Sequence, residues 1–423
     1  MTDDGCLIVL APEFAKEIRN SPALSVGRFM AERLHAHLDG FEPWRQISAP
    51  DRIFPDTIRT KLMQPLGRLI QPASVEMASI LRHEWTDETE WHRVALKPSA
   101  LAIVVRLLSV AFWPEPLHRD ARWLRIVGQY SIDSFVAADA LHRWPRMLRP
   151  VISWIAPSCR KIRLQLREAR AIMAPILRQR EADALTSDDD ALRWMEECAR
   201  GRPYDPVMAQ LGMAAVSLHS TADMLTQVLY DLCGRDELIV ALRDETRSVV
   251  QREGLTVSAL NNLHLMDSTL KESQRLKPSL AAAMQRISTD PITLSDGTRI
   301  PRNSYTIVSA DRRLDANVYP DPDTFDAYRS VRLRQTAGKE TYAQVTTPSP
   351  EHLAWGFGKH ACPGRNLVVT EIKIALAHIL LKYDLQLVDG LRPQPLKHGI
   401  VLSANSTAVI SVRRREDDVS LLS

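Results

Sequence analysis

The segment Trp355-Gly-Phe-Gly-Lys-His-Ala-Cys-Pro-Gly-Arg365 presents one cysteine in a glycine-rich loop, directly before a long apolar-periodic stretch. Glycine adopts turn conformations that other residues avoid, so Gly356, Gly358 and Gly364 let this backbone turn sharply and approach a flat cofactor. The helix expected after Cys362 begins at the sulfur, and its unpaired amides and positive dipole end favour a thiolate over a thiol. Such a thiolate can serve as an axial ligand of a haem iron.

A second polar group lies inside an expected helix over residues 206–232, which begins with Asp205 as an N-cap and proline in the first turn. The stretch Ser217-Leu-His-Ser-Thr221 places hydroxyls and an imidazole in an otherwise apolar frame. Serine and threonine inside a helix can bond to the preceding turn, so an ordinary core helix explains the stretch equally well. An imidazole beside hydroxyls can instead relay protons near neutral pH.

A third pattern is the pair Glu272 and Arg275, which share one face of a helix and can form a charge-assisted ion pair. Thr269 with Glu272 also fits a capping box at a helix start. Pairs at this spacing are frequent on solvated helices, so the segment alone predicts an ordinary surface pair.

The loop around the cysteine resembles the haem-binding signature of the cytochrome P450 superfamily, Phe-x-x-Gly-x-His/Arg-x-Cys-x-Gly. Only the first position departs, because Trp355 stands where phenylalanine is usual and keeps a large apolar ring beside the sulfur. The resemblance implies that the cofactor is haem b, with Cys362 as the axial thiolate ligand of its iron. The cofactor-binding residues that it implies are Trp355, Gly358, Gly364 and His360, the last as a contact of a haem propionate.

Arg286, which precedes an expected hairpin, is a second candidate for a propionate contact, although a solvated arginine at a strand edge explains it equally well. The early tryptophan-and-arginine contact of the family is not clearly present. Trp91 and Arg93 are of the right types but have the wrong spacing.

The resemblance also assigns roles to the other two patterns. Glu272 and Arg275 match the Glu-x-x-Arg helix of the family, whose pair forms a structural lock with a downstream arginine, and Arg329 stands where that partner is expected. Alignment with the oxygen-activating helix of the family makes His219, Ser220 and Thr221 the catalytic residues of a proton relay. The histidine replaces the usual acid, and Ser220 keeps the key hydroxyl without its methyl group. These features are similar to those of filamentous-fungal secondary-metabolism members.

This resemblance implies a haem-thiolate monooxygenase that activates O2 and hydroxylates or oxidises a bulky apolar small molecule, such as a terpenoid or polyketide-derived metabolite. The chain carries no nucleotide-binding fingerprint, so electrons are expected from a separate NADPH-dependent diflavin reductase. Two alternatives stay open. The same haem could serve an isomerase, dehydratase or peroxygenase, which would work without NADPH, or the chain could be a truncated, non-catalytic haem-binding remnant.

Composition indicates a globular protein of 423 residues, with 45% hydrophobic and 25% charged content. No linker interrupts the pattern, so residues 1–423 are expected to form a single domain and to act as a monomer. A net charge of +3 without a basic stripe argues against a nucleic-acid partner. Five widely spaced cysteines argue against a disulfide scaffold or structural zinc and favour a reducing, intracellular compartment.

The elements that must position these residues are mostly helices. Apolar periodicity predicts helices over residues 14–38, 99–112, 158–180, 206–232 and 366–383. Short β-type runs over 287–308, around the turn Ser295-Asp-Gly-Thr298, predict a hairpin, and further strands are expected near 385–388 and 407–412. Residues 319–350 are expected to be irregular. The predicted fold class is mainly α, a single large P450-type helical domain with small β-sheets.

The start of the chain differs from the family pattern. Members of this type usually open with a membrane anchor of the endoplasmic reticulum and the first strands of a β-rich subdomain. Here the apolar run 6–11 is too short to span a bilayer, so neither an anchor nor a signal peptide is expected. A soluble variant, a shortened product or an incomplete gene model would each explain this start.

Overall fold

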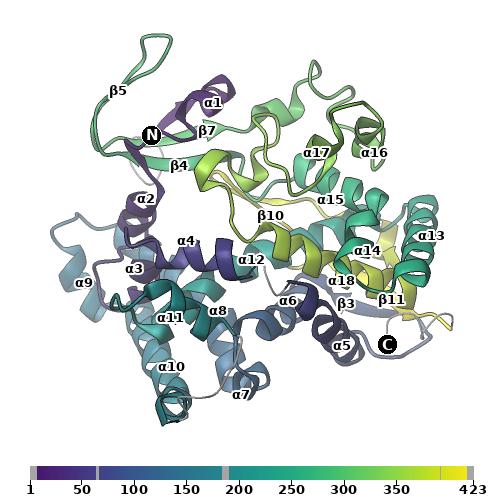
Figure 1. Cartoon of the computed structure of the whole chain (residues 1–423), viewed down its shortest axis with the longest axis horizontal. Coiled ribbons are helices and arrows are strands. Elements are labelled where there is room, and N and C mark those ends of the chain that lie inside the picture. The colour runs from purple at the N-terminus through teal and green to yellow at the C-terminus, as the bar shows by residue number, and fades with distance from the viewer. Residues whose placement is uncertain (1–6, 63–65, 183–189, 391, 417–423) are drawn as a thin grey trace.

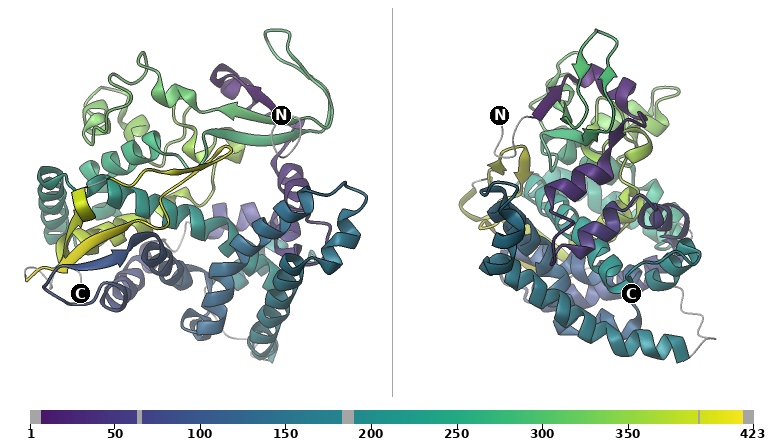
Figure 2. Two further views of the ribbon diagram at one scale, coloured as in Figure 1. Left: turned by 180° about the vertical axis from the view of Figure 1, so that it is seen from behind. Right: turned by 90° about the vertical axis from the view of Figure 1, so that its left-hand side faces the viewer.

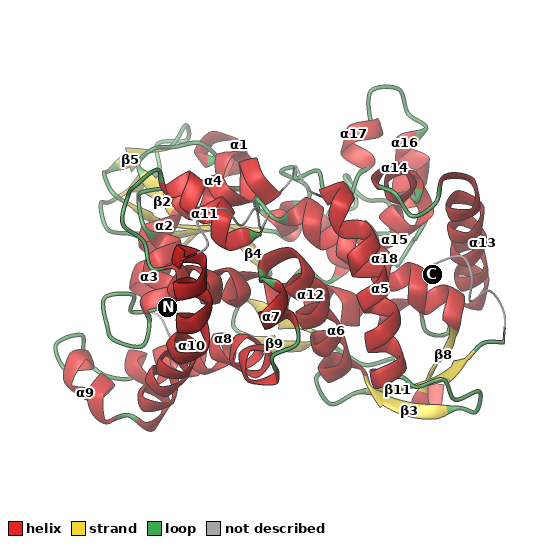
Figure 3. Cartoon of the chain, turned by 60° about the horizontal axis from the view of Figure 1, so that its bottom comes forward, coloured by secondary structure: helices red, strands yellow, loops and turns green. Residues whose placement is uncertain are grey.

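The computed structural model describes residues 7–62, 66–182, 190–390 and 392–416 (Figure 1). Helices make up most of this part of the chain, and the strands form small sheets among and beside them (Figure 3). The predicted mainly α fold with small sheets is confirmed. No described helix is long and apolar enough to cross a membrane. The four cysteines in the described ranges are unpaired, and Cys6 lies outside them.

The described α-helices are α1 (Ala15–Ile18), α2 (Val26–Arg33), α3 (Glu42–Ser48), α4 (Ile53–Thr57), α5 (Leu66–Glu84), α6 (Leu96–Phe112), α7 (Glu115–His118), α8 (Ala121–His142), α9 (Arg149–Ile155), α10 (Pro157–Ala182), α11 (Ala191–Ala199), α12 (Pro206–Leu232), α13 (Asp236–Glu253), α14 (Val257–Asn262), α15 (His264–Leu276), α16 (Arg329–Arg334), α17 (Glu340–Ala343) and α18 (Arg365–Lys382). The strands are β1 (Leu7–Leu10), β2 (Leu24–Ser25), β3 (His92–Ala95), β4 (Ala282–Ser288), β5 (Ile292–Thr293), β6 (Arg299–Ile300), β7 (Tyr305–Ser309), β8 (Tyr383–Leu387), β9 (Leu396–His398), β10 (Val401–Ser403) and β11 (Val409–Arg414).

Helix α12 runs through the centre of the molecule and packs against α3, α6, α8, α15 and α18 (Figure 1). Its start follows the sequence prediction, because Asp205 Oδ1 accepts hydrogen bonds from the amides of Val207 at 3.0 Å and Met208 at 3.1 Å. Most of its residues are buried, which explains why its apolar positions are not confined to one stripe. The helix therefore connects the layers on both of its sides.

The helix predicted over residues 14–38 is wrong as one element. The structure divides it into α1, the short strand β2 and α2. Pro22 explains the break, since proline lacks an amide donor and its predecessor disfavours the α conformation. Helix α2 then begins directly after Ser25, its N-cap, whose hydroxyl accepts a hydrogen bond from the amide of Arg28 at 3.1 Å.

Two sheets flank the helical body. Strands β1, β7, β4 and β2 form a four-stranded sheet in that order, and β3, β11 and β8 form a three-stranded sheet. The predicted hairpin is confirmed by the antiparallel pair β5 and β6, with Ile292 opposite Ile300. Figure 2 shows from behind how the C-terminal hairpin β9–β10, in yellow, extends toward the four-stranded sheet, where the amide of Ala281 donates to Ile400 O at 2.8 Å.

Substitution of Asp205 tests how much the N-cap of α12 contributes to stability. We expect Asp205→Ala to lower the free energy of unfolding by about 1 kcal/mol, because two first-turn amides lose their acceptor. Asp205→Asn is the matched control: it keeps an acceptor oxygen and removes only the exposed ion pair with Arg170 at 3.1 Å. Urea denaturation followed by circular dichroism measures both, and an equal loss in the two variants would contradict the capping role.

Candidate active site

The Glu272–Arg275 pair is buried within α15, since 3% of Glu272 and 2% of Arg275 are exposed to solvent. The surface-pair interpretation is therefore wrong. The capping-box alternative is wrong as well, because α15 begins at His264 and Thr269 lies inside the helix, where its hydroxyl donates to Leu265 O at 2.8 Å. Sequence spacing could not separate these cases, because an (i, i+3) pair has the same pattern on a buried and on an exposed face.

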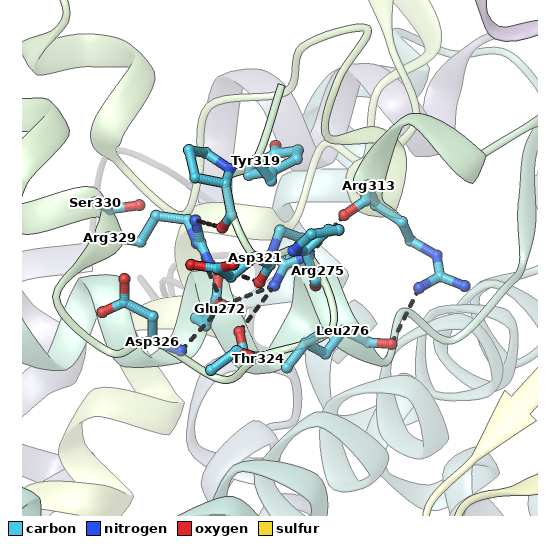
Figure 4. Close-up of polar contacts among 12 residues, drawn as sticks. Glu272, Arg275, Leu276, Arg313, Tyr319, Asp321, Thr324, Asp326, Arg329 and Ser330 are labelled. Atoms are coloured by element: carbon cyan, nitrogen blue, oxygen red, sulfur yellow. Dashed lines mark hydrogen bonds and ion pairs between the residues drawn. The ribbon is translucent and has the colours of Figure 1, made fainter. Parts of the chain in front are cut away.

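The arginine and the glutamate form a bidentate pair (Figure 4). Arg275 Nε donates to Glu272 Oε2 at 2.8 Å and Arg275 Nη2 donates to Glu272 Oε1 at 2.7 Å. The remaining nitrogen, Nη1, donates to the carbonyls of Arg313 at 2.6 Å and Pro322 at 2.7 Å. This one side chain thus satisfies its own donors and holds two turns of the segment that precedes the cysteine loop.

Arg329 completes the same group of charges (Figure 4). Its Nε lies 3.3 Å from Glu272 Oε2, and its Nη1 donates to Pro320 O at 2.7 Å. The guanidinium carbons of Arg275 and Arg329 lie 4.9 and 5.9 Å from the centre of the Tyr319 ring. The structure therefore brings together the three residues that the sequence analysis singled out, although they come from two separate segments.

Further polar side chains of α15 fasten the following segment. The hydroxyl of Ser268 accepts a hydrogen bond from the amide of Ser330 at 3.0 Å. Asp267 accepts one from the amide of Val345 at 2.9 Å and lies 2.7 Å from Lys373 Nζ of α18. Because α18 follows the cysteine directly, α15 fixes the chain on both sides of the cysteine loop.

The loop itself is closed by a short set of backbone contacts. The amide of Cys362 donates to Trp355 O at 2.8 Å, and the indole of Trp355 donates to Val345 O at 2.7 Å. Gly356 and Gly358 have φ values of +69° and +78°, which favour glycine. A Cβ at Gly358 would also lie 2.7 Å from Arg19 O. A side chain at this position would therefore collide with the N-terminal part of the chain.

Gly364 differs from the other two glycines. Its φ is −86°, and it stands at the N-cap of α18. A side chain there would meet nothing within 4 Å. The predicted need for a special turn conformation at Gly364 is therefore wrong, since its backbone is one that any residue adopts.

Burial dominates the electrostatics of Cys362. It raises the pKa of the thiol, while the amides of Gly364 and Arg365 and the charge of Arg365 oppose that rise. The amides at the helix start favour the thiolate as expected, but burial outweighs them for the free sulfur. A metal cation would supply the missing stabilisation, because a coordinated thiol loses its proton to the charge of the ion.

A group of basic side chains, Arg286, Arg59, Lys359 and His360, lies near the loop. Arg286 is 5% exposed, so the solvated-arginine interpretation is wrong, and burial lowers its pKa to about 10. Its guanidinium donates to the carbonyl of the adjacent Gln285 at 2.8 Å, and within the described ranges it pairs with no carboxylate. Burial, followed by the charges of Arg286, Lys359 and Arg59, lowers the pKa of His360 to about 4.

A buried cation without an acid partner in the described ranges, Arg286, beside the exposed Arg59 and Lys359, fits a ligand that carries carboxylates, such as the two propionates of haem. The sequence analysis missed Arg59 as a member of this group. Its guanidinium donates to Lys359 O, which places it on the cysteine loop from a segment three hundred residues earlier in the chain. Its only signal in the sequence is a positive charge inside a segment with apolar periodicity, and that signal is common.

The three predicted relay residues occupy different environments on α12. Ser220 is exposed, and its hydroxyl makes only a long contact to Ser217 O at 3.5 Å. Thr221 is buried and donates to the same carbonyl at 2.7 Å. His219 is partly buried, and burial lowers its pKa. The geometry thus leaves Ser220 with the more available hydroxyl, and the relay roles of all three residues stay predictions.

Comparisons with known proteins decide the family. Residues 207–411 match the family model described as cytochrome P450. The chain is 46% identical to cytochrome P450 monooxygenase trt6 of Aspergillus terreus, over all of this chain and 87% of that protein. The chain belongs to the cytochrome P450 family. It is also 42% identical to monooxygenase adrA of Penicillium rubens, over 99% of this chain and 84% of that protein.

A further relative, cytochrome P450 monooxygenase 1 of Gibberella fujikuroi, is 40% identical over all of this chain and 98% of that protein. These relatives come from filamentous fungi, as the sequence predicted. Cytochromes P450 are oxygenases that hold haem through a cysteine thiolate, use O2 and receive electrons from an NADPH-dependent reductase. The enzyme class and the cofactor predicted from the sequence are therefore confirmed.

The ion-pair group of Glu272, Arg275 and Arg329 leads to a prediction about stability and haem content. We expect Glu272→Gln to lower the free energy of unfolding by about 3–5 kcal/mol and to reduce the haem content of the purified protein, since two buried guanidiniums lose their counter-charge. The control is Arg332→Ala, which removes the exposed pair with Asp326 in the same segment. Pyridine haemochrome analysis per mole of protein measures haem content, and a normal value in Glu272→Gln would contradict the lock.

Proposed function

We propose that this cytochrome P450 is a monooxygenase in which Cys362 provides the axial thiolate of haem b. One observation carries the proposal: the half-buried sulfur, faced by the amides of Gly364 and Arg365, shares its loop with His360, which lies near the buried Arg286 that pairs with no acid in the described ranges. Arg286, Arg59 and His360 would bind the propionates. When bound, a thiolate-ligated haem supplies the activation of O2 for insertion of one oxygen atom into a substrate.

Polar residues of α12 would deliver protons to the active site. Ser220 would hold a proton on its available hydroxyl, and His219 would resupply it from the interior of the protein. The lowered pKa of His219 means that its imidazole is mostly neutral at pH 7 and can both accept and donate. Thr221 would keep the helix backbone in place through its bond to Ser217 O, with its hydroxyl as a second donor to the relay.

The finer parts of the function follow from the same proposal. The substrate would be a bulky apolar molecule of the terpenoid or polyketide-derived class in fungal secondary metabolism, and the electron donor a diflavin reductase. The protein would act inside the cell as a monomer. We also infer a single domain over residues 1–423, because one apolar core connects residues from Leu34 to Val412.

The ligand assignment predicts a specific spectrum. We expect the dithionite-reduced protein with carbon monoxide to show the strongly red-shifted Soret band of a thiolate complex. Cys362→Ala should lose that band, because it removes the axial sulfur, whereas the matched change Cys198→Ala at a partly exposed cysteine should keep it. A red-shifted band in Cys362→Ala would overturn the assignment, and an unshifted band in the unaltered protein would favour a non-catalytic haem-binding remnant.

The relay predicts a difference between two neighbouring hydroxyls. With NADPH and a diflavin reductase, Ser220→Ala should release about ten times as much hydrogen peroxide per NADPH consumed as the unaltered protein. The reason is that proton delivery contributes on the order of 10²-fold to the rate of such steps. Thr221→Val, which removes a hydroxyl already bonded to the helix, should raise peroxide less. Equal peroxide release in Ser220→Ala and the unaltered protein would remove Ser220 from the relay.

A further inference from the structure

Asp223 is a buried carboxylate that joins three segments far apart in the sequence. Its Oδ1 accepts a hydrogen bond from the amide of Ala404 at 2.6 Å and lies 3.2 Å from Lys97 Nζ at the start of α6. Its Oδ2 lies 3.0 Å from Lys277 Nζ, directly after α15. One side chain of α12 thus contacts α6, the end of α15 and the turn that follows β10.

The charges at this junction do not balance. Two ammonium groups share one carboxylate, and neither lysine forms an ion pair with another acid in the described ranges. The side chain of Lys277 is 5% exposed, and burial lowers its pKa while Asp223 opposes that fall. Lys97 is 25% exposed and also donates to Ala404 O at 3.1 Å. Among the described residues, Asp223 is therefore the acid that contacts both lysines, and Asp231 attracts Lys277 from a greater distance.

This junction lies beside the predicted relay. His219 and Asp223 are four residues apart on α12 and so share one face of the helix. His219 is partly buried, and its Nε2 has no hydrogen-bond partner among the described residues. Burial is the largest cause of its lowered pKa, the charge of Lys97 lowers it further, and the carbonyl of Gly128 on α8 opposes both.

We propose that Asp223 is a positioning residue for proton supply, which offsets Lys97 and Lys277 and thereby keeps His219 able to take up a proton. The proposal deepens the role given above to His219 and rests on it. Asp223 touches neither haem nor substrate in this assignment, and its effect is carried by charge. Lys97 from α6 and the Gly128 carbonyl from α8 act on His219 directly. Asp223 lies four residues further along the same helix and sets the local balance of charge through its contacts with Lys97 and Lys277.

The sign of the effect separates this role from a structural one. A negative charge near an imidazole favours its protonated form, and a positive charge disfavours it. Removal of the Asp223 charge must therefore lower the pKa of His219, whereas removal of the Lys97 charge must raise it. Both changes break the same ion pair, so a purely structural role predicts the same loss of stability in both variants and no opposite shifts.

The test uses Asp223→Asn and Lys97→Met in the reduced, carbon monoxide-bound protein, with histidine labelled by ¹³C at Cε1. The His219 signal is assigned by its loss in His219→Gln and is titrated by nuclear magnetic resonance. We expect the pKa of His219 to fall in Asp223→Asn and to rise in Lys97→Met, each by about half a pH unit or more.

The matched control is Asp231→Asn. Asp231 is a buried acid of the same helix that accepts a hydrogen bond from Ser273 at 2.7 Å and lies two turns beyond Asp223. It should leave the titration of His219 unchanged. Peroxide release measured against pH with NADPH and a reductase should move to lower pH in Asp223→Asn and to higher pH in Lys97→Met.

Unchanged titration of His219, or shifts of the same sign in both variants, would overturn the proposal. If Asp223→Asn does not fold, Asp223→Ser, which keeps an acceptor oxygen without the charge, replaces it, and an unchanged or raised pKa of His219 in that variant rejects the charge role. Failure of the proposed function has a different signature, because the unaltered protein would then lack the thiolate spectrum whatever His219 does. Opposite shifts without any change in peroxide release would place His219 outside the relay and also reject the positioning role.

Discussion

The carboxylate of Glu272 is the contact on which the haem side of this protein depends. It accepts two hydrogen bonds from Arg275 and lies 3.3 Å from Arg329, in a place where water does not reach. Through these arginines it holds the carbonyls of Arg313, Pro320 and Pro322. The segment before the cysteine contains the short helices α16 and α17 between turns, so the irregular structure expected over residues 319–350 is only partly found. The buried charge fastens the turns of this segment to α15.

A shared principle connects the cysteine loop with the centre of α12. In both places the protein buries a cation, Arg286 near the loop and Lys277 beside α12, which is costly unless something offsets the charge. At Arg286 the described residues offer no carboxylate, which suits a cofactor with two carboxylates of its own. At Asp223 one acid serves two lysines. The first imbalance would be resolved by binding haem, and at the second the carboxylate would oppose a further fall in the pKa of a neighbouring imidazole.

Local sequence signals predicted much of the fold. The cap at Asp205, the Asp-Gly hairpin and the helix after Cys362 depend on neighbouring residues, and each was found as expected. The sequence could not predict what depends on distant contacts. The place of Arg59 on the cysteine loop, the burial of Arg286 and the dominance of burial over the helix start at Cys362 all arise from packing between separate segments. The break at Pro22 was within reach of local rules.

X-ray absorption at the iron edge, measured on the purified ferric protein, tests most directly whether the cysteine loop binds haem through its sulfur. A sulfur scatterer should be present in the first coordination shell of iron in the unaltered protein and absent in Cys362→Ala. A first shell of nitrogen and oxygen alone in the unaltered protein, with haem bound, would contradict the assignment of Cys362. It would also remove the basis for placing dioxygen chemistry beside Ser220.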